Sequence, residues 1–201
     1  MSDETQRLAA LVGSRICHDL ISPVGAIQNG VELLAMEGRA GPEMALIEDS
    51  VKNASARIRF MRVAFGLAND GQPISRSEIS GTLADMSRAG RVRYDWTLDA
   101  DCLRADAQQV FLSMMCLEAA MPRGGTIVAR ALEGGWAVTG PADADRPSAA
   151  MWALLAGEPG EEPLPAHVQF AILPMVIASH ERRLSVTPGE GSVTLRISPQ
   201  G

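Results

Sequence analysis

Apolar residues recur at helical spacing along the first third of the chain. From about Glu4 to Glu37 an apolar residue returns every three or four positions, which predicts one long amphipathic helix. Gly38, Gly41 and Pro42 follow and predict that this helix ends and a second begins with proline in its first turn. The apolar stripe of the first helix is Leu8, Val12, Ile16, Leu20, Val24, Ile27, Val31 and Leu34.

The second predicted helix has the strict 3-4 spacing of a coiled-coil seam. Its apolar positions are Met44, Ile47, Val51, Ala54, Ile58, Met61, Phe65 and Ala68. Together the two helices predict an antiparallel hairpin, and two helices cover only part of each other's apolar surface. We expect a second copy of the chain to supply the rest, closing a four-helix bundle in a homodimer. The alternative is that the hairpin packs on the remainder of its own chain.

The pattern changes after Ala68, where a turn-forming segment, Asn69-Asp70-Gly71-Gln72-Pro73, interrupts the helix. We therefore expect a helical hairpin domain at residues 1–72 and a second domain at residues 73–201. Apolar spacing in the second domain predicts helices at 75–88, 106–121, 149–155 and 166–180, and strands at 92–98, 126–132, 136–139, 184–187 and 193–197. This mixture predicts an α+β domain with helices on one face of a sheet.

Composition narrows the class of protein. The 201 residues carry a net charge of −6 with Lys52 as the single lysine, and the arginines are scattered, which argues against nucleic-acid binding. No apolar run of about 18 residues and no signal peptide opens the chain, so we expect a cytoplasmic protein without a membrane partner. Cys17, Cys102 and Cys116 are odd in number and lack metal-ligand spacing, so we expect neither disulfides nor a zinc site.

One histidine lies in the first helix on the side opposite the apolar stripe. This is His18, within the segment Cys17-His18-Asp19-Leu20-Ile21-Ser22-Pro23. At about 100° per residue its side chain points to solvent. Imidazole titrates near neutral pH, so a neutral ring offers a nitrogen lone pair to the acyl phosphate of an aspartate. An exposed imidazole therefore indicates a reactive residue, and accepting a phosphoryl group is one reaction open to it.

Two polar neighbours are candidates for a part in this chemistry. Asp19 lies about 100° around the helix from His18, where it either orients the ring and stabilises the imidazolium or is a solvated charge. Ser22, one turn later, either donates a hydrogen bond to the phosphoryl group or bonds back to the carbonyl of His18. We include both with His18 in the candidate catalytic site.

The face around His18 predicts a docking surface for a partner. Small and polar residues let a partner backbone approach, and Leu11 and Ile21 would be exposed apolar contacts. Arg59 and Arg62 of the second helix should flank His18, either facing phosphate or an acidic partner pocket or as solvated charges. The residues expected to dock a partner are Leu11, Ser14, Arg15, Ile21, Gly25, Asn29, Arg59 and Arg62.

The segment from His18 to Pro23 resembles the phospho-acceptor box of sensor histidine kinases. The run from Met121 to Gly125, the strand pair after it and the closing segment from Glu190 to Ile197 resemble the kinase ATP-binding domain, and the resemblance spans nearly the whole chain. It implies that the hairpin is followed by an α+β sandwich of the histidine-kinase (Bergerat/GHKL) type.

The residues that hold nucleotide in that family are missing. Leu112 and Cys116 occupy the helix turns that should offer asparagine, and neither supplies an amide oxygen. The adenine-reading loop has become Gly140-Pro141-Ala142-Asp143-Ala144-Asp145, and residues 169–172 replace a glycine-rich junction. The resemblance therefore implies a degenerate domain without ATP.

An acceptor helix joined to such a domain resembles the ChpT type of histidine phosphotransferase, most closely over residues 14–27. This implies relay of a phosphoryl group from the receiver Asp of a hybrid histidine kinase, through His18, to the receiver Asp of a response regulator. The receiver would bring its own Mg²⁺, and this chain would need no cofactor. The alternatives are a non-catalytic adaptor that only binds a receiver, and an ATP-dependent histidine kinase. The second domain would either stabilise the helical bundle or bind the receiver domain.

Overall fold

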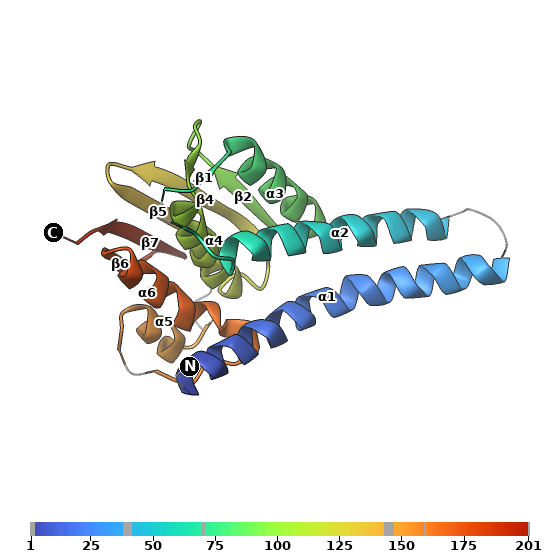
Figure 1. Ribbon diagram of the computed structural model, residues 1–201, viewed down its shortest axis with the longest axis horizontal. Coiled ribbons are helices and arrows are strands. Elements are labelled where there is room, and N and C mark those ends of the chain that lie inside the picture. The colour runs from blue at the N-terminus through green and yellow to red at the C-terminus, as the bar shows by residue number, and fades with distance from the viewer. Residues whose placement is uncertain (1–2, 38–41, 70, 143–146, 159, 201) are drawn as a thin grey trace.

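A hairpin of two long helices extends from an α+β domain (Figure 1). The computed structural model describes residues 3–37, 42–69, 71–142, 147–158 and 160–200. Helix α1 spans Asp3–Glu37 and continues through Pro23, and α2 spans Pro42–Ala64. Both predicted helices and their antiparallel arrangement are thus confirmed, while the expected turn at residues 38–41 lies outside the described residues.

Helix α2 ends four residues before Ala68, the last position of the predicted seam. A side chain at Gly66 would place its Cβ 2.2 Å from the carbonyl oxygen of Arg62, so the chain turns where only glycine fits. The side-chain amide of Gln108, buried in the second domain, donates to the carbonyls of Ala64 at 3.3 Å and Gly66 at 2.7 Å. It thereby satisfies carbonyls that the helix end leaves free.

The second domain contains every predicted helix and strand, with shifted ends. The helices are α3 (Arg76–Ala89), α4 (Arg104–Ala119), α5 (Ala149–Leu155) and α6 (Gln169–Ser179), preceded by a 3-10 turn, η1 (Pro165–His167). The strands are β2 (Val92–Trp96), β4 (Gly125–Leu132), β5 (Gly135–Pro141), β6 (Arg182–Gly189) and β7 (Ser192–Pro199), with the short strands β1 (Pro73–Ile74) and β3 (Cys102–Leu103). Ser75 is the N-cap of α3 and accepts from the backbone N–H of Glu78 at 3.1 Å.

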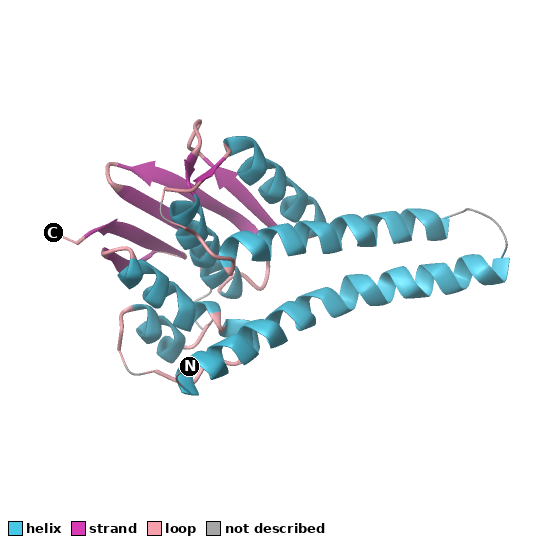
Figure 2. Cartoon of the chain, in the orientation of Figure 1, coloured by secondary structure: helices cyan, strands magenta, loops and turns pink. Residues whose placement is uncertain are grey.

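The large sheet has the strand order β2-β4-β5-β7-β6 (Figure 2). Strands β2 and β4 run parallel and the other neighbours are antiparallel. Side chains alternate across the sheet: Ile127 and Ala129 are buried under the helices, while Thr126 and Arg130 are exposed on the opposite face. The predicted arrangement, with α3, α4 and α6 covering one face, is confirmed.

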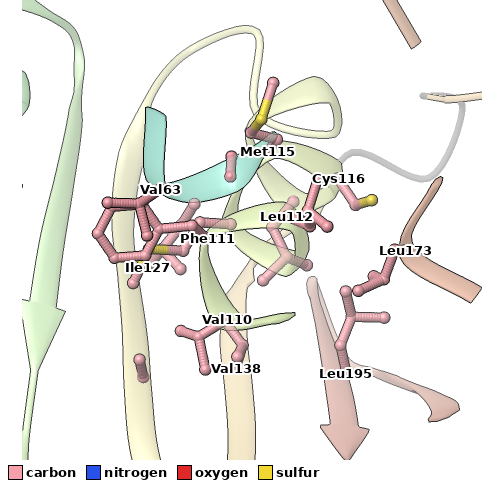
Figure 3. Close-up of a cluster of buried hydrophobic side chains, with 14 of the residues drawn as sticks. Val63, Val110, Phe111, Leu112, Met115, Cys116, Ile127, Val138, Leu173 and Leu195 are labelled. Carbon is pink, nitrogen blue, oxygen red and sulfur yellow. The ribbon is translucent and has the colours of Figure 1, made fainter. Parts of the chain in front are cut away.

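Helix α4 lies at the centre of the core, and its residues from Ala107 to Leu117 are all buried. Figure 3 shows Phe111 and Leu112 of this helix among side chains from the sheet. The core also includes the last turns of α2, where the Phe60 ring stacks on Phe111 with centroids 4.7 Å apart. The hairpin is therefore packed against residues 73–201 at one end, which was the alternative to packing on a second copy.

The other end of the hairpin leaves apolar side chains exposed within the described chain. On α1, Val24 and Val31 are 54% and 53% exposed although both belong to the predicted stripe. On α2, Met44 and Val51 are exposed although they belong to the predicted seam. One helix pair thus cannot bury this half of its own apolar surface.

Candidate functional site

His18 lies near the middle of α1 with a side chain that is 77% exposed, as the helical phase predicts. Its Nδ1 is 3.1 Å from Oδ1 of Asp19. An ionised carboxylate only accepts hydrogen bonds, so in the neutral ring this contact assigns the proton to Nδ1 and the lone pair to Nε2. This arrangement leaves a nucleophilic nitrogen on an exposed ring.

Asp19 is turned inward, and its side chain is only 10% exposed. Its second oxygen, Oδ2, accepts a hydrogen bond from Nε of Arg15 at 2.8 Å. Both carboxylate oxygens are therefore engaged, one by the histidine and one by the arginine. Of the two roles considered for Asp19, this geometry favours orienting the ring over a solvated charge.

Arg15 does not point to an incoming partner, which contradicts its expected place on the docking surface. Its side chain is 16% exposed. Besides Asp19 it contacts the second domain, where Nη1 donates to the backbone carbonyl of Ala166 in η1. The 60° offset from His18 on the helical wheel, about one-sixth of a turn, is enough to bring this long side chain against the second domain.

Behind Arg15 and Asp19 lies a small cavity of about 10 Å³. It is also lined by Arg57 of α2 and Glu118 of α4, between apolar walls of Phe60, Met61, Met86 and Met115. The hydroxyl of Tyr94 on β2 donates to Oε2 of Glu118 at 3.2 Å. This charged cluster could not be predicted from local spacing, because α1, α2, β2 and α4 each contribute to it.

Burial perturbs the acids of this cluster. It raises the pKa of Glu118 above its ordinary value of 4.5, although Arg15 and Arg57 act in the opposite direction. Burial, with the neighbouring Glu118 charge, also raises the pKa of Tyr94 well above 10.0. The tyrosine is therefore a hydrogen-bond donor at neutral pH.

The rest of the expected docking face is largely open. Leu11 is only partly exposed, and Ile21 is 70% exposed. A Cβ added at Gly25 would have no atom within 4 Å, so a partner could approach the backbone there. The exposed polar residues of this face are Ser14, Ser22 and Asn29.

Arg59 and Arg62 do not line the cavity behind His18. Arg59 forms an ion pair with Asp85, and Nη2 of Arg62 is 3.3 Å from Oε1 of Glu78, both acids belonging to α3. Arg59 lies two residues beyond Arg57 and hence about 200° around α2. The arginine of α2 that lines this cavity, together with Arg15 and Asp19, is Arg57.

Three residues of the segments that the kinase resemblance associates with nucleotide binding are core side chains. Leu112, Cys116 and Phe170 are fully buried in the apolar cluster (Figure 3 shows the first two), and burial raises the pKa of the Cys116 thiol. Residues 143–146 of the altered loop lie outside the described residues. In the described parts of the chain no group of His, Cys, Asp and Glu has an arrangement suited to a metal ion.

No helix among the described residues has the length and apolar character needed to cross a membrane. The cysteines Cys17, Cys102 and Cys116 are free.

Comparison with known proteins identifies the class. Residues 76–192 match the family described as the histidine phosphotransferase C-terminal domain. The protein phosphotransferase ChpT of Brucella abortus (strain 2308) is 38% identical over 167 residues, which are 80% of this chain and 79% of that protein. The chain therefore belongs to the histidine phosphotransferase family, and within it to the ChpT type.

The fold agrees with this assignment. A solved structure of a bacterial phosphotransferase superposes with a TM-score of 0.77 at 27% sequence identity, covering 98% of each chain. The expected resemblance to a ChpT-type histidine phosphotransferase is thus confirmed, and the hairpin and α+β domain occur together in a relative.

Proposed function

We propose that His18 relays a phosphoryl group from the aspartate of a hybrid kinase receiver domain to the aspartate of a response regulator receiver domain, without ATP. The observation that carries this proposal is the exposed imidazole whose Nδ1 is engaged by Asp19. A ring held in this way presents Nε2 to a visiting domain. Membership in the histidine phosphotransferase family supports the same reaction.

In the first transfer the Nε2 lone pair attacks the phosphorus of the receiver's aspartyl phosphate. The N–P bond forms as the P–O bond to the aspartate breaks, and the receiver carboxylate leaves. The ring gains positive charge, which the Nδ1–H···Asp19 hydrogen bond stabilises. In this proposal Ser22, which is exposed one turn after His18, donates a hydrogen bond to a phosphoryl oxygen. The reverse reaction loads the second receiver.

The second domain supports a reaction without ATP. Leu112 and Cys116 fill the core where a kinase offers amide oxygens to Mg²⁺ and phosphate. Phosphoryl transfer requires mainly positioning and charge stabilisation, so the partner receiver would supply the Mg²⁺. No cofactor of this chain enters the proposal.

The open face of α1 is the proposed docking surface for both receivers. It comprises Leu11, Ser14, Ile21, Gly25 and Asn29, on which the exposed Ile21 is the apolar contact. Arg59 and Arg62 form ion pairs with acids of α3. They would contact a docked receiver only if the receiver extends from α1 across α2. Arg15 is left out because it is engaged inside the chain.

We further propose that the chain is a homodimer. Apolar side chains at the loop end of the hairpin, such as Val24 and Val31 on α1 and Val51 on α2, are exposed in one copy. A second copy in a four-helix bundle would bury them. The free cysteines fit the expected cytoplasmic location.

The test is transfer from a phosphorylated receiver to the purified full-length protein. We expect an acid-labile label on the protein, its loss in His18→Ala, and normal labelling in the control His180→Ala. Labelling by ATP alone would identify a kinase instead. Receiver binding without any label on the protein would identify an adaptor. His18→Ala protein that still accepts phosphate would refute the assigned residue.

A further inference from the structure

We propose that Arg15 and Glu118 are positioning residues through which the second domain holds Asp19, and therefore His18, in the geometry for phosphoryl transfer. The inference rests on the proposed function of His18. It assigns the degenerate domain a task at the acceptor site, and it gives Arg15 a role in positioning in place of partner docking.

A chain of contacts connects His18 to the second domain. His18 Nδ1 contacts Asp19 Oδ1 at 3.1 Å, and Asp19 Oδ2 contacts Arg15 Nε at 2.8 Å. Arg15 Nη1 then donates to the carbonyl of Ala166, 151 residues away in sequence. A guanidinium group is planar with donors in fixed directions, so anchoring it at η1 also restricts the carboxylate that it holds.

Positive and negative side chains are balanced in number behind Asp19. Arg15 and Arg57 face Asp19 and Glu118 around one cavity of about 10 Å³. A cavity of this volume holds about one water molecule, so little solvent lies among the four charged groups. Arg15 and Arg57 both stabilise the charged form of Glu118, and Asp19 opposes it. The two cations therefore face two carboxylates, and Arg57 also donates from Nε to Oδ1 of Asn53 at 3.1 Å.

Loss of Glu118 would upset this balance of charge. With one carboxylate removed, both guanidinium groups would compete for Asp19 and draw it from His18. The imidazole would lose the partner that keeps the proton on Nδ1, and Nε2 would be protonated more often. A ring with hydrogen on Nε2 has no lone pair there to attack phosphorus.

The remaining titratable groups around this cluster leave its charge balance intact. Tyr94 on β2 stays neutral and donates to Glu118. His167 of η1 has its pKa lowered by burial and by the nearby charge of Arg15, so it is uncharged at neutral pH. No other charged side chain lines the cavity in the described part of the chain.

The experiment compares Arg15→Gln and Glu118→Gln with wild type and with the control Arg7→Gln. Arg7 also connects α1 to the second domain, through an ion pair with Glu162 at 3.1 Å, but this pair is exposed and does not contact Asp19. Long-range ¹H–¹⁵N spectra of the full-length protein report the tautomer of each of its three histidines. Labelling by phosphoramidate, a small phosphodonor, reports the reactivity of His18 without a docking partner.

We expect wild type and Arg7→Gln to hold His18 with the proton on Nδ1. Both test variants should increase the form with hydrogen on Nε2. Phosphoramidate labelling should slow roughly tenfold in Arg15→Gln, the effect of one lost charge-assisted hydrogen bond, and less in Glu118→Gln. Arg15→Lys, which keeps the charge but not the fork of donors, should be intermediate.

Three results would overturn the proposal. One is a wild-type His18 already protonated on Nε2. Another is unchanged tautomer and phosphoramidate labelling in both variants. The third is an Arg15→Gln protein impaired only in transfer from a receiver, which would return Arg15 to the docking surface. If circular dichroism shows Arg15→Gln to be unfolded, the isosteric Glu118→Gln decides. Failure of wild type to accept phosphate from any receiver would refute the proposed function but not this positioning.

Discussion

The two ends of the helical hairpin have the same apolar periodicity but different surroundings. At the domain end, Phe60 and Val63 of α2 are 3% and 2% exposed and belong to the core of the α+β domain. At the loop end, Val51 is 46% and Val31 is 53% exposed. A heptad pattern therefore specifies that a face will be buried, and not which partner will bury it.

This difference also separates two tasks. His18 lies in the half of α1 nearer the domain end, and the second domain contacts its neighbour Arg15, which in turn binds Asp19. The loop end has apolar surface and, in this proposal, serves association with a second copy. Mutations at the two ends should therefore have different consequences, and the following four predictions test that, from the largest expected effect to the smallest.

Phe60→Ala should destabilise the fold most. The ring lies 4.7 Å from that of Phe111 and 5.9 Å from that of Tyr94, so truncation leaves a cavity and costs about 3–5 kcal/mol in free energy of unfolding. Denaturant unfolding at fixed protein concentration measures it. The control Leu67→Ala, at an 89% exposed position, should change stability by no more than about 0.5 kcal/mol. Equal effects of the two would mean that α2 is not part of the core.

Val31→Glu should dissociate the homodimer without unfolding the α+β domain. A carboxylate in the bundle core would lose its hydration without a partner, at a cost on the order of 2 kcal/mol or more. Light scattering should give twice the 21.3 kDa chain mass for wild type and one chain mass for the variant. Asn29→Glu adds the same charge about 200° around α1 and should remain dimeric. A monomeric wild type would exclude the bundle.

Glu118→Gln should change the pH dependence of stability. The folded-state pKa of Glu118 is raised above 4.5, so the folded protein binds this proton more tightly than the unfolded chain does. Its contribution to stability is present below pH 4.5 and is lost as pH rises through the raised pKa. Relative to wild type, the variant should therefore gain stability as pH rises through that window. Parallel curves of unfolding free energy against pH would contradict the burial of this carboxylate.

Arg62→Ala should have the smallest effect. Its ion pair with Glu78 is 3.3 Å long, and the two side chains are 63% and 37% exposed. Such pairs contribute about 0.2–1 kcal/mol, and thermal unfolding at low and high salt measures the contribution. If the ion pair with Glu78 of α3 is the only role of Arg62, transfer from a phosphorylated receiver should be unchanged. A large loss of transfer rate would return Arg62 to the docking surface.

Much of the fold was predictable from local patterns. The seven-residue helix α5 was predicted at the residues 149–155 that it occupies in the structure. Strands β1 and β3 were missed because two residues are too few to show a period. The end of α2 was placed four residues late since Gln108, which binds its last carbonyls, is distant in sequence.

Within the candidate site, the features that depend on one helix were predictable and the contacts between elements were not. The exposure of His18 and the closeness of Asp19 follow from helical phase, because both residues lie on one helix. Arg15 lies on that helix too, but its direction depends on Ala166. Arg57 and Glu118 could not be connected to His18 in advance, because the register of α1 against α2 and α4 is set by side-chain packing.

The amino-acid sequence by itself determined the helical hairpin and the exposed imidazole, since both depend on local spacing. Only the tertiary structure decided that Asp19 faces inward, that Arg15 joins α1 to η1 and that Glu118 completes the charged cluster. The physical reason is that a long charged side chain, such as that of Arg15, can reach several partners. Burial against another element then selects one of them.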